Sequence, residues 1–330
     1  MIFLNNDKLK KAINFLLLNL IIFGTNAQTK WINLDSLYQP LPPSMHIYKS
    51  TDTLDGKPNV MYYVIADLKD KNLEFASDTS MNRRLTPSQF YKKNEKPLLV
   101  VNCSFFSFAT NRNLNVVVKD KKIVSYNEHT ISGKGKDTLT YMHPFFGVMG
   151  ISKKRNADVA WVYSDSAKRF LYASQKPVHF LKDSLFGINL DYVKNGAKPP
   201  AHFSKWKMQT AIGGGPVLLQ NGEIKISNNE EMKFSGKAIN DHHPRTAIGY
   251  TKDNHLIILV CEGRSETAAG LTLNQEAKIL KDLGCVEALN LDGGGSSCML
   301  INGKETNTPS SKGIQRQVPS VFLIFDKLNR

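Results

Sequence analysis

Short apolar runs separated by turn-forming residues dominate the hydrophobic pattern of this chain. The runs are rich in Val, Ile, Leu and Tyr, which is typical of β-strands. The predicted strands are Val60–Asp67, Leu98–Cys103, Asn115–Lys119, Leu256–Cys261, Ala288–Asp292 and Val318–Phe325.

Two Asn-Gly pairs lie between apolar or alternating residues and predict β-hairpins. One is Asn221-Gly222 within VLLQNGEIKI, and the other is Asn302-Gly303 within MLINGKE. Both central positions of such a two-residue turn need a positive φ, which Asn and Gly tolerate.

Helical patterns are fewer. Thr86-Pro87-Ser88-Gln89 forms a capping box that opens a short helix to about Lys93. A longer helix is predicted over Leu273–Leu283, where Thr272 is the cap, Gln275 follows three residues later and Gly284 ends the helix. Leu273, Ala277, Leu280 and Leu283 share one face of this helix.

Together these elements predict an α+β fold: a strand-rich single domain with a mixed β-sheet and a few flanking helices. Residues 28–44 form a lead-in segment with several prolines, and residues 45–330 form the domain itself. Residues 151–205 show no clear period and are interpreted as a variable insertion or a rim near the site.

The first 27 residues have the pattern of a signal peptide. Lys8, Lys10 and Lys11 precede an apolar run, and small residues before Ala27 suit cleavage after it. The apolar run is shorter than the roughly 20 residues that span a bilayer, although an uncleaved anchor is the alternative. We expect export to the periplasm or the medium, without stable membrane insertion after cleavage.

The net charge of the whole chain is +14, and loss of the first 27 residues, with three lysines and one aspartate, lowers it to +12. Such a balance favours anionic partners, and a phosphorylated sugar or an anionic glycan is expected. No nucleic-acid-binding motif is present, so nucleic acid is not expected as a partner. The four cysteines, Cys103, Cys261, Cys285 and Cys298, show no metal-binding spacing and predict no particular disulfide.

The segment LNLDGGGSS, residues 289–297, places an acid at the end of a predicted strand. Three glycines, Gly293, Gly294 and Gly295, follow Asp292, and Ser296 comes after them. Consecutive glycines let backbone N–H groups approach phosphate oxygens, although a flexible turn explains the same residues. The segment is neither a Walker loop nor a GxGxxG motif.

Two further segments carry paired charges beside apolar strands. In HHPRTAIG, Arg245 precedes a β-prone run and His243 is a potential proton carrier. In VCEGRSETAAG, Glu262 and Arg264 follow a strand directly. Arginine forms bidentate hydrogen bonds with phosphate or carboxylate. The alternative for Arg245 is a surface ion pair, and the alternative for Glu262 and Arg264 is a charged hairpin end.

Two more segments bring small or amide side chains to strand ends. Gly214 and Gly215 in IGGGPVLLQ permit a close backbone approach or simply make a turn. In VVNCSFF, Asn102 ends a strand and Ser104 follows, so the amide is positioned to bind a sugar hydroxyl.

In this order, HPRTAIG, GR after an apolar strand, GLTL and NLDGGGSS resemble the phosphodiester glycosidase family. The resemblance covers Gln209–Phe325 most strongly and extends to VVNCSFF. It implies hydrolysis of a sugar-1-phosphodiester at the glycosidic C–O bond, which releases an N-acetylglucosamine-like sugar and a phosphomonoester.

The resemblance also implies roles for individual residues. Arg245 and Arg264 would neutralise the phosphate, and Asp292 and Glu262 would supply acid, base or nucleophile. The expected substrate-binding set is Asn102, Ser104, His243, Gly214, Gly215, Gly293, Gly294, Gly295, Ser296 and Arg316, with Gln315 beside it. Cys103-Ser104 and Glu262 depart from the family pattern, which leaves the pocket wall and the role of that carboxylate open.

No cofactor is required in this scheme, although two acids beside a phosphate are able to hold Ca²⁺ or Mg²⁺. Two alternatives stay open at this point. One is a phosphodiesterase that attacks the phosphorus of a glycan polymer. The other is a non-enzymatic glycan-binding module, for which the acids Glu262 and Asp292 would be unnecessary.

Overall fold

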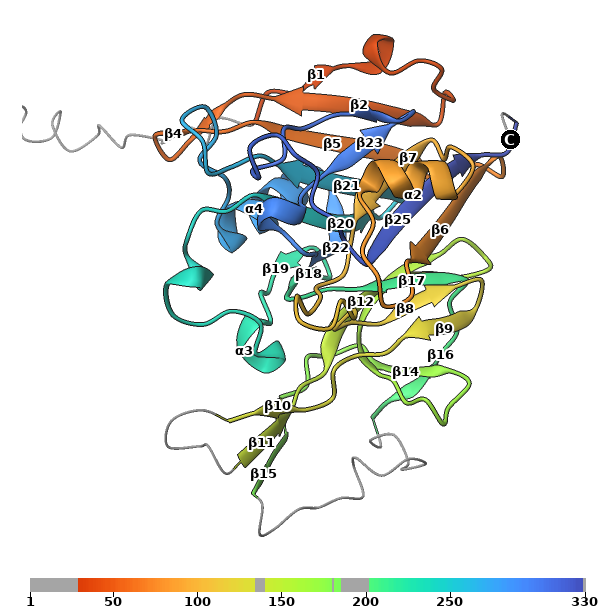
Figure 1. Ribbon diagram of the computed structural model, residues 1–330, viewed down its shortest axis with the longest axis vertical. Helices are drawn as coiled ribbons and strands as arrows, with labels where there is room; N and C mark the ends of the chain where they lie inside the picture. The colour runs from red at the N-terminus through yellow and green to blue at the C-terminus, as the bar shows by residue number, and fades with distance from the viewer. Residues whose placement is uncertain (1–28, 134–139, 180, 185–201, 329–330) are drawn as a thin grey trace, which may run out of the picture.

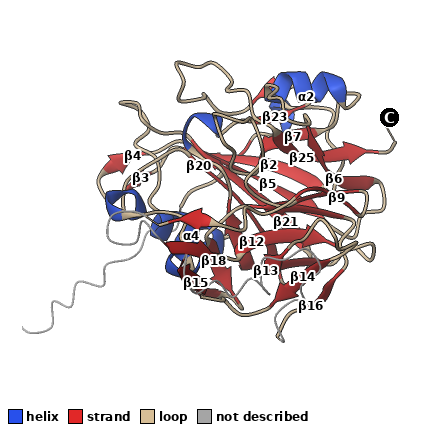
Figure 2. Ribbon diagram, turned by 60° about the horizontal axis from the view of Figure 1, so that its bottom comes forward, coloured by secondary structure: helices blue, strands red, loops and turns tan. Residues whose placement is uncertain are grey.

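The computed structural model describes residues 29–133, 140–179, 181–184 and 202–328, so the predicted signal peptide lies outside the described residues. Figures 1 and 2 show several twisted sheets packed on one another, with only a few short helices at their edges. No helix in the described part of the chain is long and apolar enough to cross a membrane.

The largest sheet has eight strands in the order β1-β2-β5-β21-β20-β22-β18-β19. It combines N-terminal strands with strands from the last third of the chain (Figure 1). Their bounds are β1 Ile32–Asn33, β2 Met45–Ser50, β5 Met61–Asp67, β18 Val217–Gln220, β19 Glu223–Ile224, β20 Arg245–Thr251, β21 His255–Cys261 and β22 Cys285–Asn290.

A five-stranded sheet in the order β24-β23-β7-β25-β6 lies beside the first sheet. It pairs the strand that ends at Asn102 with the strand that follows the glycine loop, residues 293–295. Its strands are β6 Leu73–Thr79, β7 Leu99–Asn102, β23 Met299–Ile301, β24 Lys304–Glu305 and β25 Ser320–Asp326.

A seven-stranded sheet in the order β16-β14-β13-β12-β17-β8-β9 forms the lower half of the molecule in Figure 1. Its strands are β8 Val117–Lys119, β9 Lys122–Ser125, β12 Phe146–Ile151, β13 Ala157–Tyr163, β14 Leu171–Ser174, β16 Ser204–Trp206 and β17 Thr210–Gly213. Two small sheets complete the strands: β10 Ile131–Ser132, β11 Thr140–His143 and β15 Leu181–Ser184 in one, β3 Thr53–Leu54 and β4 Lys57–Pro58 in the other.

The strand-rich α+β fold is confirmed, but its sheets are not mixed in direction. Every strand pair in the described ranges is antiparallel. The helix between β21 and β22 carries the chain past β20, so β22 pairs with β20 rather than with β21. The expectation of a mixed sheet was therefore wrong, because neither this crossover nor the one from β6 to β7, which are separated by β25, places parallel strands next to each other.

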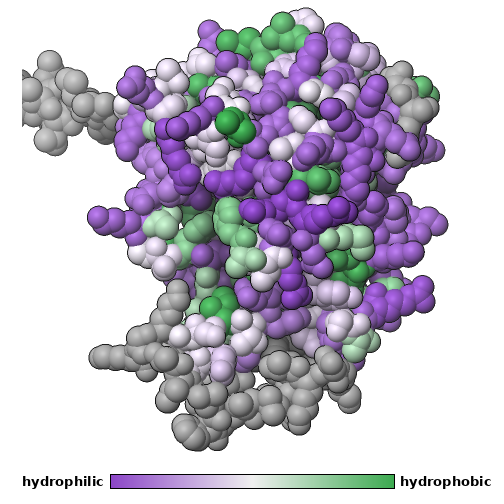
Figure 3. Space-filling model, in the orientation of Figure 1, coloured by the Kyte–Doolittle hydropathy of each residue, from purple (hydrophilic) through white to green (hydrophobic). Residues whose placement is uncertain are grey.

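Both faces of the eight-stranded sheet are buried at its central strands, whereas the edge strands β1 and β19 are exposed. Along β21, Ile258 belongs to the cluster shared with the other large sheets, whereas Ile257 and Leu259 face the helix side. This two-sided burial gives the continuous apolar runs from which the strands were predicted. Polar side chains cover most of the face in Figure 3, where apolar residues appear only as separate patches.

The α-helices of the described chain are α2 Pro87–Lys93, α3 Asn228–Glu231 and α4 Leu273–Asp282, with short 3₁₀ turns η1 Asp35–Leu37, η4 Gly236–Ile239 and η5 Gly294–Ser296. Both predicted capping boxes are present, at Thr86 with Gln89 and at Thr272 with Gln275. The apolar face of α4 packs on the eight-stranded sheet. Both predicted hairpins are also confirmed, with positive φ at each Asn and Gly.

We expect Thr272→Ala to lower the free energy of unfolding by about 1 kcal/mol, because the backbone N–H of Gln275 loses its side-chain acceptor. Urea denaturation measures this change. Thr267→Ala, at an exposed position outside the helix, is the matched control and is expected to change stability by less than about 0.5 kcal/mol. Equal losses in the two variants would show that the cap contributes nothing.

The described part of residues 151–205 is not a rim. Strands β13, β14 and β16 belong to the seven-stranded sheet, and Trp161 is only 1% exposed in the main core. The last five residues of β13 are all buried, so its sequence has no alternation of polar and apolar positions. The absence of a hydrophobic period in the sequence of β13 is therefore explained by the burial of this strand on both faces.

Candidate functional site

Asp292 follows the end of β22, at the junction of the eight- and five-stranded sheets. Its backbone N–H donates to the carbonyl of Cys103 at 2.8 Å, and its carbonyl accepts from the Asn102 amide. The Asn102 amide oxygen accepts from Thr246 Oγ1 at 3.0 Å and from the Cys298 N–H at 3.1 Å. Asn102 is fully buried, so these contacts fix the backbone of Asp292, whereas the predicted contact of Asn102 with substrate stays a prediction.

The Asp292 carboxylate is held in an environment that favours its neutral form. Burial raises the pKa of Asp292 to about 6, and a hydrogen bond from Ser296 and the charges of Arg316 and Lys233 partly oppose this. Its Oδ2 atom is buried and has no hydrogen-bond partner among the described residues. A carboxylate oxygen that the protein leaves without a donor is available to a reacting atom or to water.

The glycine loop after Asp292 allows two guanidinium groups to approach the backbone. Gly294 has a φ of +62°, and a Cβ there would lie 3.2 Å from the Arg264 guanidinium. A Cβ at Gly295 would collide with the Arg316 guanidinium. Any side chain at these positions would displace an arginine, so the glycines are required for a cationic site beside Asp292.

Arg316 continues this cationic site toward Asp292. Its Nη1 lies 3.3 Å from Ser296 Oγ, and the Ser296 side chain is hydrogen-bonded to Asp292. Arg316 is half-buried, so part of its guanidinium is available to a ligand. These contacts bring Ser296 and Arg316 together beside Asp292, and their predicted contact with substrate stays a prediction.

Lys233 is a site residue that sequence reasoning missed. Its ammonium group lies 4.3 Å from the centre of the Phe105 ring and 4.1 Å from that of Phe146. Burial lowers the pKa of Lys233 to about 8, and the charges of Glu231, Asp292 and Glu128 oppose this. No motif surrounds Lys233 in the sequence, and only the tertiary fold brings it to Asp292.

The other predicted glycine pair lies against Lys233. The Gly215 N–H donates to the Asn290 carbonyl at 2.8 Å, two residues before Asp292. A Cβ at Gly215 would meet the side chains of Glu231 and Lys233. Gly214 packs on the same carbonyl of Asn290. The glycines therefore let the loop before β18 bring Lys233 close to the end of β22.

Glu231 anchors the segment that carries Lys233. Its fully buried carboxylate accepts from the backbone N–H groups of Gly147 and Val217, at 2.9 and 2.8 Å. It also accepts from Trp161 Nε1 at 3.2 Å and Ser227 Oγ at 2.6 Å. All four partners donate, so this side chain is a structural acceptor rather than a catalytic group.

Replacing Glu231 with glutamine is expected to reduce the free energy of unfolding by about 1–3 kcal/mol. The new NH₂ group would face donors and would leave buried N–H groups without an acceptor. Chemical denaturation measures the loss, and Glu230→Gln, at the preceding, partly exposed position, is the control. Unchanged stability in Glu231→Gln would contradict the assigned role.

Arg245 makes contacts that hold the protein together. It is 2% exposed, and it donates to the carbonyls of Leu271 at 3.0 Å and Asp241 at 3.3 Å. Glu276 on α4 is fully buried near it, and burial raises the pKa of Glu276 to about 8. These contacts give Arg245 a structural role. Its expected contact with phosphate stays a prediction.

His243 lies beside the exposed Arg264, with 3.2 Å between His243 Nδ1 and Arg264 Nη2. Burial and the charges of Arg245 and Arg264 lower the pKa of His243, so its ring is neutral at pH 7. A neutral ring accepts a hydrogen bond from Arg264 and orients that guanidinium toward the glycine loop.

Glu262 and Ser104 contact residues other than Asp292. Glu262 Oε1 accepts from the Thr308 N–H at 2.8 Å, and burial raises the pKa of Glu262. Ser104 is buried, with its hydroxyl 3.8 Å from the Cys103 sulfur. Their contacts join neither of them to Asp292, and their assigned roles stay predictions. Gln315 bonds to Ser88 and Glu305, which keeps the segment before Arg316 in place.

All four cysteines are buried and unpaired with one another. Among the described residues, no three His, Cys, Asp or Glu side chains gather as a metal-binding group. A Ca²⁺ or Mg²⁺ ion here would depend on oxygens of the backbone or of a ligand, and the expectation that no cofactor is required stays untested.

The chain is similar to known proteins over part of its length. A model of the phosphodiester glycosidase family matches residues 95–325. The N-acetylglucosamine-1-phosphodiester α-N-acetylglucosaminidase of mouse is 33% identical over 107 residues, which are 30% of this chain and 20% of the mouse protein. An uncharacterised SPβ prophage-derived protein of Bacillus subtilis is 40% identical over 86 residues, 26% of this chain and 13% of that protein.

These matches span well under half the length of either relative. Among solved structures, the catalytic domain of the zebrafish N-acetylglucosamine-1-phosphodiester α-N-acetylglucosaminidase, auto-inhibited by its pro-peptide, has a similar fold. Its TM-score is 0.56 at 20% identity, and the match covers 90% of this chain and 88% of that domain.

Proposed function

Because the chain belongs to the phosphodiester glycosidase family, we propose that it hydrolyses a sugar-1-phosphodiester at the glycosidic C–O bond. The products are the free sugar, N-acetylglucosamine or a close analogue, and a phosphomonoester. The observation that carries the proposal is the placement of Asp292, whose buried Oδ2 has no partner in the described chain, next to a loop flanked by Arg264 and Arg316.

The cations bind the phosphate and stabilise its departure. Arg264 and Arg316 lie against the glycine loop, and Lys233 contributes a third positive charge close to Asp292. The leaving phosphomonoester has a second pKa of about 6, so it departs without strong protonation. Fixed positive charges that meet the growing negative charge therefore supply much of the stabilisation.

Asp292 acts on the anomeric carbon. In its ionised form it either attacks that carbon or removes a proton from the attacking water, while the C–O bond to the phosphate breaks. The enclosed position that raises its pKa also excludes bulk water. Glu262 is proposed as the assisting carboxylate, through a rearrangement of its bond to Thr308.

The test is a set of sugar-1-phosphodiesters, each incubated with the mature protein, with and without chelator. Chromatography coupled to mass spectrometry identifies the products. Release of free sugar and phosphomonoester at the same rate under both conditions supports the proposal. Release of sugar-1-phosphate in place of free sugar would identify a phosphodiesterase, and loss of turnover with chelator would identify a metal-dependent enzyme.

We further propose that the protein is exported, on the pattern of residues 1–27. Mass spectrometry of the protein from the periplasm or the medium should show an N-terminus at Gln28. A full-length chain in the cell pellet would contradict export with cleavage.

A further inference from the structure

A pocket of about 230 Å³ opens at one end of the seven-stranded sheet. Residues from β8, β9, β14 and the segment around β16 line it, and Figure 1 shows these strands together in the lower half of the molecule. We call it the Trp206 pocket and define it by its apolar lining, which is Val118, Ile123, Phe170, Leu171, Trp206 and Met208. None of these residues belongs to the candidate active site, so the pocket is a separate feature of the fold.

The inner wall of the Trp206 pocket is apolar. Trp206 and Leu171 are buried and lie opposite each other on paired strands. Trp206 Nε1 donates to the Asp158 carboxylate at 2.5 Å, so the indole has no polar atom left for a ligand. An apolar cavity of about 150 Å³ is enough to hold benzene. The Trp206 pocket is therefore large enough for an aryl ring or a short alkyl chain.

Four exposed cations also line this pocket: Lys121, Lys153, Arg169 and Lys207. No carboxylate of the described chain lines the pocket with them. None of the four forms an ion pair with any residue that the structure describes. The apolar wall therefore adjoins a concentration of positive charge that the described part of the protein does not neutralise.

The Phe170 ring gathers three cations around one point. The Arg169 guanidinium carbon lies 5.4 Å from the ring centre, and the ammonium groups of Lys205 and Lys207 lie 4.8 and 5.4 Å from it. The face of an aromatic ring attracts each cation, but the cations still repel one another. An anion bound beside Phe170 would reduce this repulsion, so this end of the sheet favours a negatively charged ligand.

A wider recess of about 430 Å³ adjoins the Trp206 pocket and shares Lys121 and Arg169 with it. We call it the Lys121 recess. Lys122 and Lys168 also line it, and Asp120 is the one acid among its described lining residues. Lys121 and Arg169 therefore lie at the junction between an apolar pocket and a cationic recess.

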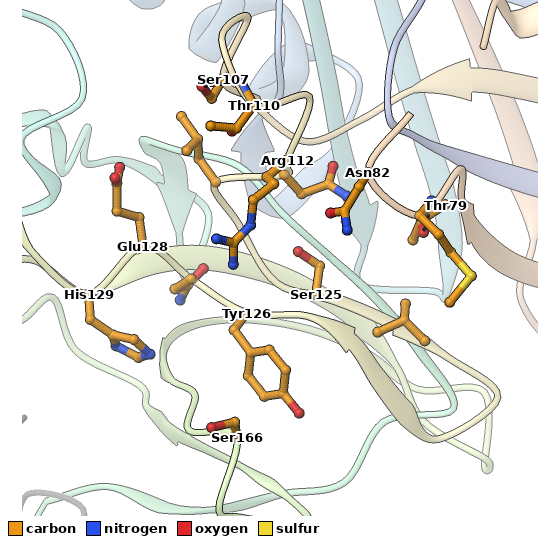
Figure 4. A pocket seen from close by; sticks show the side chains of 15 residues that line it. Thr79, Asn82, Ser107, Thr110, Arg112, Ser125, Tyr126, Glu128, His129 and Ser166 are labelled. Carbon is orange, nitrogen blue, oxygen red and sulfur yellow. Dashed lines mark hydrogen bonds between the residues drawn. The ribbon is translucent and has the colours of Figure 1, made fainter. Parts of the chain in front are cut away.

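The larger cleft in Figure 4, of about 560 Å³, lacks this excess of one charge. Arg112 points into it, but Glu128 lines the same cleft and carries the opposite charge. The remaining lining is mostly hydroxyl and amide side chains. This cleft gives no preference for an anion, and Arg112 is a suitable control cation for the Trp206 pocket.

We propose that the Trp206 pocket and the Lys121 recess together bind a small amphipathic anion. Its alkyl or aryl body lies in the pocket, and its carboxylate, phosphate or sulfate group lies between Lys121 and Arg169. β17 separates this site from the catalytic centre: Gln209, just before β17, lines the pocket, whereas Gly214, just after it, packs on Asn290. The proposal does not depend on the proposed hydrolysis.

Calorimetric titration of the whole protein with octanoate, octanol and acetate tests the site. Octanoate should bind, octanol should bind at least about tenfold more weakly because it lacks the charge, and acetate should give no measurable binding. Arg169→Gln should weaken octanoate binding about tenfold and leave octanol unaffected. Arg112→Gln is the matched control and should change neither. Both arginines are exposed, so both variants should fold.

NMR of the indole N–H groups locates the bound probe. Octanoate should shift the signal of Trp206 and leave those of Trp31, on the eight-stranded sheet, and Trp161, in the main core, in place. Equal affinity for octanoate and octanol, equal losses in the two arginine variants, or an unshifted Trp206 signal would each overturn the proposal. Binding of phosphatidylglycerol vesicles without binding of octanoate would assign the cations to a membrane surface and would also overturn it.

Discussion

Asp292→Asn is expected to lower kcat/KM for a sugar-1-phosphodiester by at least about 10³-fold. The amide keeps the size and position of the side chain but can neither attack the anomeric carbon nor accept a proton from water. Steady-state kinetics on a purified diester measures the loss.

The same variant is expected to fold normally at pH 7. The pKa of Asp292 in the folded protein, about 6, lies above its ordinary value of 3.8. Ionisation therefore disfavours the folded state progressively between these two pH values, and this cost is constant at higher pH. The neutral amide removes the cost, so the free energy of unfolding should be equal or higher.

Asp282→Asn, at a carboxylate paired with Lys278 on the surface of α4, is the matched control and should keep normal turnover. Near-normal turnover by Asp292→Asn would show that Asp292 is not essential for the reaction. Glu262 would then be the main candidate for the catalytic carboxylate.

Lys233→Met is expected to reduce kcat/KM by about 10–100-fold, the usual effect of losing one charged hydrogen-bond partner. Methionine retains the apolar contact with Phe105 and Phe146 but removes the positive charge from the phosphate site. Lys237→Met, at an exposed position on η4, is the control for loss of a charge from the same part of the chain.

Lys233 also predicts the alkaline side of the pH profile. Asp292 must be ionised, so kcat/KM should rise with pH near 6, and Lys233 must be protonated, so kcat/KM should fall near pH 8. The two groups interact, and the apparent values belong to the pair. Lys233→Met should lose the alkaline limb while it retains the acidic one. An unchanged alkaline limb in this variant would contradict the role of Lys233.

Local sequence patterns predicted much of the fold. The capping boxes at Thr86 and Thr272 and the two Asn-Gly turns depend on neighbouring residues alone, and all four are present. β13 was missed because burial on both faces removes the alternation that marks a strand. The antiparallel arrangement of β22 beside β20 depends on tertiary packing, which no local pattern encodes.

The sequence indicated those candidate site residues that lie in one contiguous segment. Asp292, the glycines and Ser296 lie together in the sequence and in the structure. Lys233 was missed because its neighbours, Phe105 and Asp292, are far from it in the sequence. The expected contacts of Asn102 and Arg245 with substrate stay predictions, and both side chains also bond to backbone carbonyls, those of Asp292 and Leu271. Residue type and position do not distinguish a substrate ligand from a group that holds such a ligand in place.

Hydrolysis of an N-acetylglucosamine-1-phosphodiester in ¹⁸O-labelled water tests the central claim most directly. If Asp292 directs attack at the anomeric carbon, mass spectrometry will find the label in the free sugar and none in the phosphomonoester. Label in the phosphate product would show attack at phosphorus and would contradict the account.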